Sequence, residues 1–179
     1  MGYLATLKMT DGKIIRLNLF PEYAPNTVKN FVELANQGYY DGLIFHRIID
    51  GFMIQAGGYW VDGNQLNEAP KKEGLQKAKT IKGEFRSNGF AQNTLTHEAG
   101  VLSMARTNVK DSASAQFFIC SADAPHLDGE YAAFGKTADD ESLKNVQKLA
   151  KSRTGFVAGM SDFPYPLVEI ESLRVEKSE

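Results

Sequence analysis

The chain opens with an alternation of apolar and polar residues that predicts a β-hairpin. Residues 3–9 and 13–20 alternate on either side of Asp11-Gly12, a pair that is typical of tight turns between antiparallel strands. Because successive side chains of a strand point to opposite faces, the second run has one apolar and one polar face. The apolar face consists of Ile15, Leu17 and Leu19, and the polar face of Arg16 and Asn18.

Two other segments carry apolar residues at the spacing of an amphipathic helix. The first extends from Pro25 to Asn36, with proline suited to a first helical turn and Gly38 placed where a left-handed residue ends a helix. The second extends from Asp139 to about Arg153, with acidic residues at its start and basic residues near its end, as the helix dipole favours. The inward-facing residues are predicted to be Val28, Phe31, Val32 and Ala35 in the first helix, and Leu143, Val146 and Ala150 in the second.

Strand-like runs make up most of the remaining pattern. They lie at residues 43–49, 52–57, 101–105, 116–121, 131–136 and 167–175. Turn-rich segments rather than repeated helices separate these runs, so a mainly β fold is expected instead of a doubly wound parallel sheet. The poorly patterned stretch from Tyr59 to Thr80 contains glycine and proline residues and is expected to form a long loop.

Length and charge narrow the class of protein. The 179 residues suit a single domain, residues 1–179, with a sizeable core. With 20 basic and 22 acidic residues the net charge is −2, so neither nucleic acid nor an anionic membrane is an expected partner. One cluster of lysines is interrupted by Glu73 and is expected to be a solvated surface loop. It consists of Lys71, Lys72, Lys77, Lys79 and Lys82.

The single cysteine, Cys120, bears on the expected location of the protein. One cysteine cannot form an intrachain disulfide, and a reducing cytoplasm is therefore the expected compartment. No stretch approaches the roughly 18 apolar residues that a membrane span needs. The N-terminal segment also lacks the apolar core of a signal peptide. No long apolar surface helix suggests obligate assembly, so a monomer is expected.

The run from Phe45 to Gly58 is otherwise strand-like and apolar, yet it contains an arginine and a glutamine. Charged side chains are rarely buried without a partner. Arg47 is therefore either a charge on the solvent side of the sheet or part of a site walled by Phe52 and Met53. The residues alone leave both interpretations open.

This run resembles the signature of the cyclophilins, a family of peptidyl-prolyl cis-trans isomerases. Two further blocks follow in the order seen in that family: residues 100–106 with 114–119, and residues 127–136. The resemblance spans nearly the whole chain and is greatest to bacterial-type cytoplasmic members. It implies a closed antiparallel eight-stranded barrel with two capping helices. It also implies isomerase activity on proline-containing peptides and on unfolded or folding proteins, without a cofactor or metal.

The resemblance also assigns roles to individual residues. Arg47, with Gln55 and Phe52, would be catalytic, because a permanently charged guanidinium can donate a hydrogen bond to the proline nitrogen as the amide twists. Gln55 would orient Arg47 or donate to the substrate. Without the resemblance, the apolar residues of the implied site would be taken for core residues; these are Phe52, Met53, Phe118 and Leu127. The residues implied to bind substrate are Met53, Ala105, Arg106, Gln116, Phe118, His126, Leu127 and Tyr131.

The chain departs from the cyclophilin pattern at three places. His126 stands where many members have tryptophan, and Tyr131 stands where many have histidine. Tyr131 can keep the ring packing, so catalysis is expected to survive. Because the tryptophan supports cyclosporin recognition in the family, the affinity of this chain for cyclosporin is expected to be weakened. The loop 107–113 differs in length and lacks the usual glycine and proline, which puts groove contacts there in question.

Other functional classes receive less support from the sequence. A hydrolase would recruit Ser103 or Ser121 with a histidine, but no Gly-x-Ser-x-Gly elbow surrounds either serine. A metal site would need clustered ligands, whereas the histidines stand far apart without a ligand spacing. These histidines are His46, His97 and His126.

The main alternative is a non-catalytic module of the same fold that binds proline-containing segments or acts as a chaperone. Such a binder needs the apolar pocket but no group tuned to a twisted amide. The presence of both Arg47 and Gln55 therefore favours catalysis.

Overall fold

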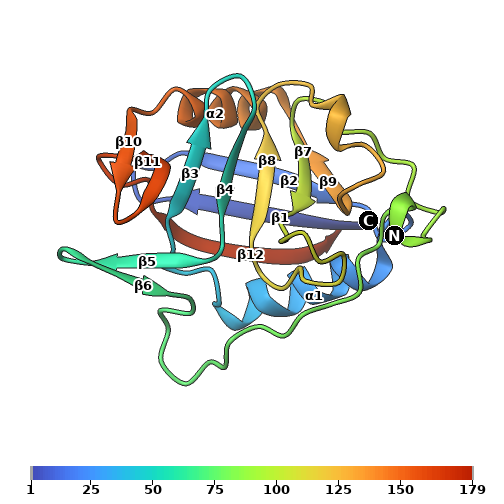
Figure 1. The fold of residues 1–179 in the computed structure, drawn as a ribbon, viewed down its shortest axis with the longest axis horizontal. Coiled ribbons are helices and arrows are strands. Elements are labelled where there is room, and N and C mark those ends of the chain that lie inside the picture. The colour runs from blue at the N-terminus through green and yellow to red at the C-terminus, as the bar shows by residue number, and fades with distance from the viewer. Residues whose placement is uncertain (1, 179) are drawn as a thin grey trace.

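A computed structural model describes residues 2–178 and contains an eight-stranded antiparallel sheet curled into a barrel (Figure 1). In spatial order its strands are β12 (Ile170–Ser178), β1 (Gly2–Met9), β2 (Ile14–Leu19), β9 (Ala133–Thr137), β7 (Val101–Met104), β8 (Phe117–Cys120), β4 (Met53–Ala56) and β3 (Phe45–Ile49). The predicted mainly β class and strand number are confirmed. Closure is limited, because the two outer strands meet through one isolated bridge, between Ile44 and Glu169.

The predicted N-terminal hairpin forms between β1 and β2. Leu7 lies opposite Ile15 across the two strands, and Gly12 in the turn has a φ of 94°, a conformation that glycine adopts without strain. The apolar face of β2 is directed into the core as the alternation predicted. Its members Ile15, Leu17 and Leu19 are at most 2% exposed.

The two helices lie at opposite ends of the barrel, α1 (Pro25–Gln37) below and α2 (Asp140–Ala150) above in Figure 1. Gly38 ends α1 in a left-handed conformation, as predicted. Asp139 caps α2, because its side chain accepts a hydrogen bond from the Ser142 backbone N–H at 2.7 Å. The second helix ends earlier than the predicted Arg153, at Ala150.

An aromatic cluster joins α1 to the strands that carry the candidate site. The ring centroid of Phe31 lies 5.5 Å from that of Phe117 and 5.1 Å from that of Phe134, both in edge-to-face geometry. These two contacts tie the helix to β8 and β9. Since Phe117 is directed into this core, the next residue along β8, Phe118, is directed to the opposite face of the sheet.

The stretch from Tyr59 to Thr80 is not one long loop, and that prediction was wrong in its first half. Residues 59–68 form a hairpin of β5 (Tyr59–Asp62) and β6 (Gln65–Glu68) that projects from the barrel in Figure 1. A second hairpin, which the sequence pattern did not predict, consists of β10 (Thr154–Val157) and β11 (Met160–Pro164) and lies beside β3. No helix within the described part of the chain is long and apolar enough to cross a membrane.

Candidate active site

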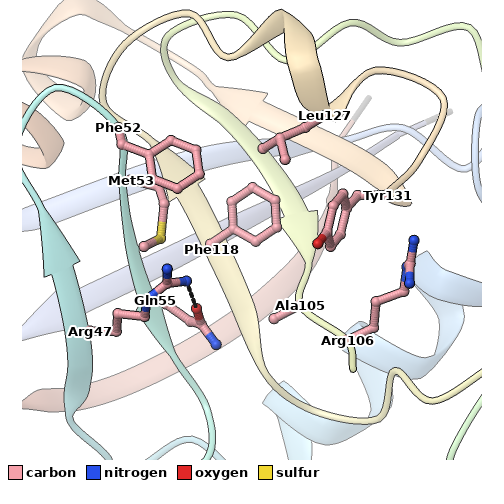
Figure 2. A pocket seen from close by; sticks show the side chains of 9 residues that line it. All are labelled: Arg47, Phe52, Met53, Gln55, Ala105, Arg106, Phe118, Leu127 and Tyr131. Atoms are coloured by element: carbon pink, nitrogen blue, oxygen red, sulfur yellow. Dashed lines mark hydrogen bonds between the residues drawn. The ribbon is translucent and has the colours of Figure 1, made fainter. Parts of the chain in front are cut away.

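A pocket of about 130 Å³ opens on the outer face of the sheet, over β3, β4, β8 and the end of β7 (Figure 2). Its far wall includes the short helix η2 (Pro125–Leu127). All the residues around it are ones that the sequence analysis proposed for the site. They are Arg47, Phe52, Met53, Gln55, Ala105, Arg106, Phe118, Leu127 and Tyr131.

The register of the sheet brings these side chains together from distant parts of the chain. Arg47 on β3 lies opposite Gln55 on β4, and Gln55 lies opposite Phe118 on β8. Directly opposed residues of antiparallel strands have their Cβ atoms about 5 Å apart, which is close enough for their side chains to interact. A row of arginine, glutamine and phenylalanine therefore crosses three neighbouring strands.

The polar part of this row is hydrogen-bonded. Arg47 Nη1 donates to Gln55 Oε1 at 3.4 Å, the dashed contact in Figure 2, and Gln55 Nε2 donates to Gln116 Oε1 at 2.9 Å. Arg47 is exposed, and no ion pair among residues 2–178 includes it. Its positive charge is therefore not neutralised by a carboxylate and remains available to a ligand.

The floor of the pocket is apolar and separate from the main core. Met53, Phe118 and Leu127 are at most 8% exposed and belong to a small hydrophobic cluster of their own, against which Phe52 and Tyr131 pack. The interpretation of these residues as part of the central core is therefore not supported. They form a local apolar surface to one side of Arg47 (Figure 2).

Arg106 closes the other side of the pocket. Its guanidinium carbon lies 4.7 Å from the ring centroids of both Phe85 and Tyr131, at a distance suited to cation–π attraction. Its Nη2 donates to the Glu130 carbonyl at 2.7 Å. Tyr131 in turn meets Phe118 edge to face, with centroids 5.8 Å apart. Both side chains are thus held by several contacts.

The family model described as cyclophilin type peptidyl-prolyl cis-trans isomerase/CLD matches residues 4–175. This chain belongs to the cyclophilin-type peptidyl-prolyl cis-trans isomerases. Peptidyl-prolyl cis-trans isomerase B of Bacillus subtilis is 44% identical to it over 140 residues, which cover 77% of this chain and 86% of the relative. Peptidyl-prolyl cis-trans isomerase B of Escherichia coli is 35% identical and covers 97% of this chain and 100% of the relative.

Solved cyclophilin structures share the fold. The cyclophilin-type isomerase of Cryptosporidium parvum, crystallised in the presence of the dipeptide Ala-Pro, superposes with a TM-score of 0.70. That comparison covers 98% of this chain and 99% of the other at 26% sequence identity. The barrel and its two helices are therefore those of the cyclophilin family.

Two of the site residues that the cyclophilin resemblance implied lie outside the main pocket. His126 is exposed, with its ring 5.4 Å from that of Phe52, so it lies beside the pocket wall rather than in the pocket. Gln116 lines an adjoining pocket of about 150 Å³ that shares Gln55, Ala105 and Arg106 with the first. Together the two pockets form a longer groove over the cyclophilin sheet.

The adjoining pocket is formed in part by the loop in which this cyclophilin departs from the family pattern. Thr107 and Ser112 of this loop line it together with the neighbouring Ser114, and none of the three was proposed as a site residue from the sequence. The Thr107 backbone N–H donates to Ser112 Oγ at 2.9 Å, and the Thr107 hydroxyl donates to the same oxygen at 2.8 Å. Hydroxyl residues in a loop gave no periodic signal from which this role could be predicted.

The hydrolase alternative is disfavoured by burial. Ser103 Oγ lies 2.9 Å from His97 Nε2, but Ser103 is 0% exposed and so cannot be reached by a substrate.

Burial, and secondarily the Arg47 charge, lowers the pKa of His46 from its usual 6.5 to about 4, so this histidine is neutral near pH 7. Within residues 2–178, no three histidine, cysteine or acidic side chains are grouped so as to hold a metal ion.

Proposed function

We propose that the pocket beside Arg47 is where this cyclophilin accelerates rotation about X-Pro peptide bonds. The observation that carries the proposal is a guanidinium without a carboxylate partner, placed beside a small apolar pocket. Phe118, Met53 and Leu127 would hold the proline ring. Ala105 and Gln116 would lie along the peptide backbone in the groove.

The chemistry follows from the nature of the barrier. Amide resonance imposes ~18–20 kcal/mol on rotation of a peptide bond. Twisting removes the resonance and leaves a lone pair on the proline nitrogen, so no covalent bond need break. A hydrogen bond from Arg47 to this nitrogen strengthens only as the lone pair develops, which is the preference for the transition state that catalysis requires.

The magnitude required is reasonable for a charged donor. Each ~1.4 kcal/mol of preference for the twisted amide gives a tenfold acceleration, so ~4 kcal/mol gives about a thousandfold. Gln55 holds the guanidinium from the neighbouring strand, at the 3.4 Å contact between Arg47 Nη1 and Gln55 Oε1. Its role would be to limit the rotamers of Arg47 so that the donor is already oriented when the peptide binds.

The experiment compares wild type with Arg47→Ala by two-dimensional exchange NMR on a short Ala-Pro peptide. We expect catalysed exchange to fall by about a thousandfold in Arg47→Ala while peptide affinity changes little. The matched control is Arg153→Ala, which replaces an exposed arginine directly before strand β10 and should keep the wild-type rate. Peptide binding without accelerated exchange in wild type would instead establish the alternative, a proline-binding module.

Several narrower features form part of the same proposal. We propose that residues 1–179 act as one domain and one monomer on proline-containing segments of folding proteins. The single buried thiol of Cys120 supports a reducing, cytoplasmic location. The exposed imidazole of His126 at the site edge supports weakened cyclosporin affinity, since it offers less apolar surface than an indole.

A further inference from the structure

A line of buried hydrogen bonds lies behind the pocket and is not explained by the proposed chemistry. Asp128 Oδ1 accepts from the His97 backbone N–H at 2.6 Å and lies 3.0 Å from His97 Nδ1. On the other side of the ring, His97 Nε2 lies 2.9 Å from Ser103 Oγ. The side chain of His97 is 0% exposed and that of Asp128 is 26% exposed.

This line connects Leu127 with Phe118, two apolar residues of the pocket floor. Asp128 directly follows Leu127, and Ser103 on β7 lies opposite Phe118 on β8. The His97 ring is nearly parallel to that of Phe118, with an interplanar angle of 16° and centroids 6.0 Å apart. The backbone N–H of Ala124 also donates to the His97 carbonyl at 2.8 Å, so the segment that carries Leu127 is attached to His97 on both sides.

The partners determine which nitrogen of the ring carries the proton. An ionised carboxylate only accepts hydrogen bonds, so His97 Nδ1 must be the donor to Asp128. Burial lowers the pKa of His97, which keeps the ring neutral near pH 7. Nε2 is then the acceptor, and the Ser103 hydroxyl donates to it. Both ring nitrogens of His97 and the Ser103 hydroxyl are satisfied in this one arrangement, which makes alternative side-chain positions costly.

We infer that Asp128 and His97 are positioning residues, which hold Phe118 and Leu127 at a fixed separation for the proline ring. Neither lines the pocket, so they act through the residues that do. The inference deepens the proposed function and rests on it, because it concerns the same pocket. It gives the buried serine and histidine and the partly buried aspartate a structural purpose in place of the nucleophilic one that they resemble.

The main test replaces Asp128 in two ways. Both hydrogen bonds from His97 end on one oxygen, so the amide oxygen of Asp128→Asn can accept them, whereas Asp128→Ala cannot. We expect Asp128→Ala to weaken binding of an Ala-Pro peptide about tenfold, with the exchange rate of the bound peptide changed less than threefold. Asp128→Asn should recover most of the lost affinity.

A matched control distinguishes this role from general loop capping. Asp123 accepts from the Ala99 backbone N–H at 2.9 Å, whereas the hydrogen bonds of the His97 ring are with Asp128 and Ser103. Asp123→Ala should therefore bind the peptide like wild type. Equal affinity losses in Asp123→Ala and Asp128→Ala, or wild-type affinity in a folded Asp128→Ala, would overturn the inference.

A spectroscopic readout does not depend on isomerase activity. Long-range proton–nitrogen NMR of wild type should show the ring proton of His97 on Nδ1, and Asp128→Ala should move it toward Nε2. A proton on Nε2 in wild type would contradict the inference even if exchange catalysis is confirmed. Conversely, the absence of catalysed exchange in wild type would count against the proposed function without altering this result.

A second variant covers the case in which Asp128→Ala fails to fold. The double variant His97→Phe with Ser103→Ala replaces both members of a buried hydrogen bond by apolar groups, which is nearly neutral for stability. It keeps a ring against Phe118 but removes the hydrogen bond from the ring to Asp128, so that only the backbone N–H of residue 97 still donates to this carboxylate. We expect the same tenfold loss of peptide affinity, and wild-type affinity in this variant would refute the positioning role.

Discussion

At the scale of the residue, three arginines show how surroundings decide what a guanidinium can do. Arg174 donates to both carboxylate oxygens of Asp41 at 2.8 Å, so its charge is satisfied within the protein. Arg106 lies between two aromatic rings and donates to the Glu130 carbonyl. Only Arg47 of these three is held by a single long hydrogen bond to a neutral amide. We therefore expect Arg47, rather than the other two arginines, to donate a hydrogen bond to the lone pair that develops on the proline nitrogen.

The departure at His126 gives a prediction about cyclosporin. His126→Trp places a larger apolar ring with an N–H donor next to Phe52, which the present imidazole meets at 5.4 Å. We expect the variant to bind cyclosporin about tenfold more tightly than wild type, because an added aromatic contact and hydrogen bond contribute about 1.4 kcal/mol. Inhibition of Ala-Pro exchange measures the change.

The control for that variant is His126→Phe, which adds apolar ring surface without an N–H donor. Its gain in cyclosporin affinity should be smaller than that of His126→Trp. If neither variant changed the affinity for cyclosporin, the weakened affinity would be due to the loop 107–113 rather than to His126.

Most of the pocket could be predicted because its residues fall in contiguous blocks of sequence. Arg47, Phe52, Met53 and Gln55 lie within one short run, so a resemblance over that run identifies them together. The line behind the pocket could not be predicted in the same way. Asp128 and His97 are 31 positions apart, and their contact depends on how two loops fold over the sheet.

At the scale of the element, the start of α1 depends on a residue far along the chain. Ala24 precedes the helix and supplies no side-chain cap. Glu84 fills this role from a loop, because its Oε1 accepts from the Thr27 backbone N–H at 2.6 Å and from the Thr27 hydroxyl at 2.7 Å. Glu84 is 2% exposed, and a carboxylate at a helix N-terminus is stabilised by the helix dipole.

Removing this cap should destabilise the protein without touching the pocket. We expect Glu84→Ala to lower the free energy of unfolding by about 3 kcal/mol, since buried donors of Thr27 lose their acceptor. Glu84→Gln keeps one oxygen and should lose about half as much. Denaturant unfolding measures both values.

The matched control is Glu33→Ala, at an exposed position on the same helix. It should change the free energy of unfolding by less than about 0.5 kcal/mol. A Glu84→Ala protein as stable as Glu33→Ala would contradict the capping role.

Strands with a regularly alternating buried face were predictable, and the short strands of the two outer hairpins, which lack this alternation, were not. The alternation in β2 is clear because one of its faces is buried in the core. In β10, by contrast, Thr154, Gly155 and Phe156 are all exposed, so no alternation marks the strand. β5 and β6 likewise have no fully buried residue. Their hairpins form from local pairing, which leaves little trace in the hydrophobic pattern.

At the scale of the whole molecule, the protein has two apolar clusters with different purposes. The larger fills the barrel and packs α1 and α2 against the strands. The smaller lies on the outer face and forms the floor of the pocket. Because the sheet separates them, a change in the pocket floor need not disturb the packing that maintains the fold.

The pH dependence of stability should reflect the buried histidines. The pKa of His46 is about 4 in the folded protein and near its usual 6.5 when unfolded, so the unfolded state binds more protons between these values. The free energy of unfolding should therefore fall as the pH drops from 6.5 to 4, by up to about 3 kcal/mol from this residue. The lowered pKa of His97 acts in the same direction.

Denaturant unfolding of wild type and His46→Gln across this range isolates the contribution. Glutamine does not titrate, so the variant should lose less stability toward pH 4. Asp139, whose pKa is held below 3.8 by its hydrogen bond with Ser142, should lose its contribution only at more acidic pH. Parallel curves for the two proteins would show that His46 does not carry this dependence.

The two successive phenylalanines of β8 bear on how such a protein can diverge. Phe117 is directed into the barrel and Phe118 into the pocket, so inserting or deleting one codon within the strand would exchange the two surfaces. The loop 107–113, which precedes β8, has no such alternation of two faces to maintain. We therefore expect length changes in this loop to alter which sequences flanking a proline the proposed groove accepts, and to leave the proposed pocket for the ring unchanged.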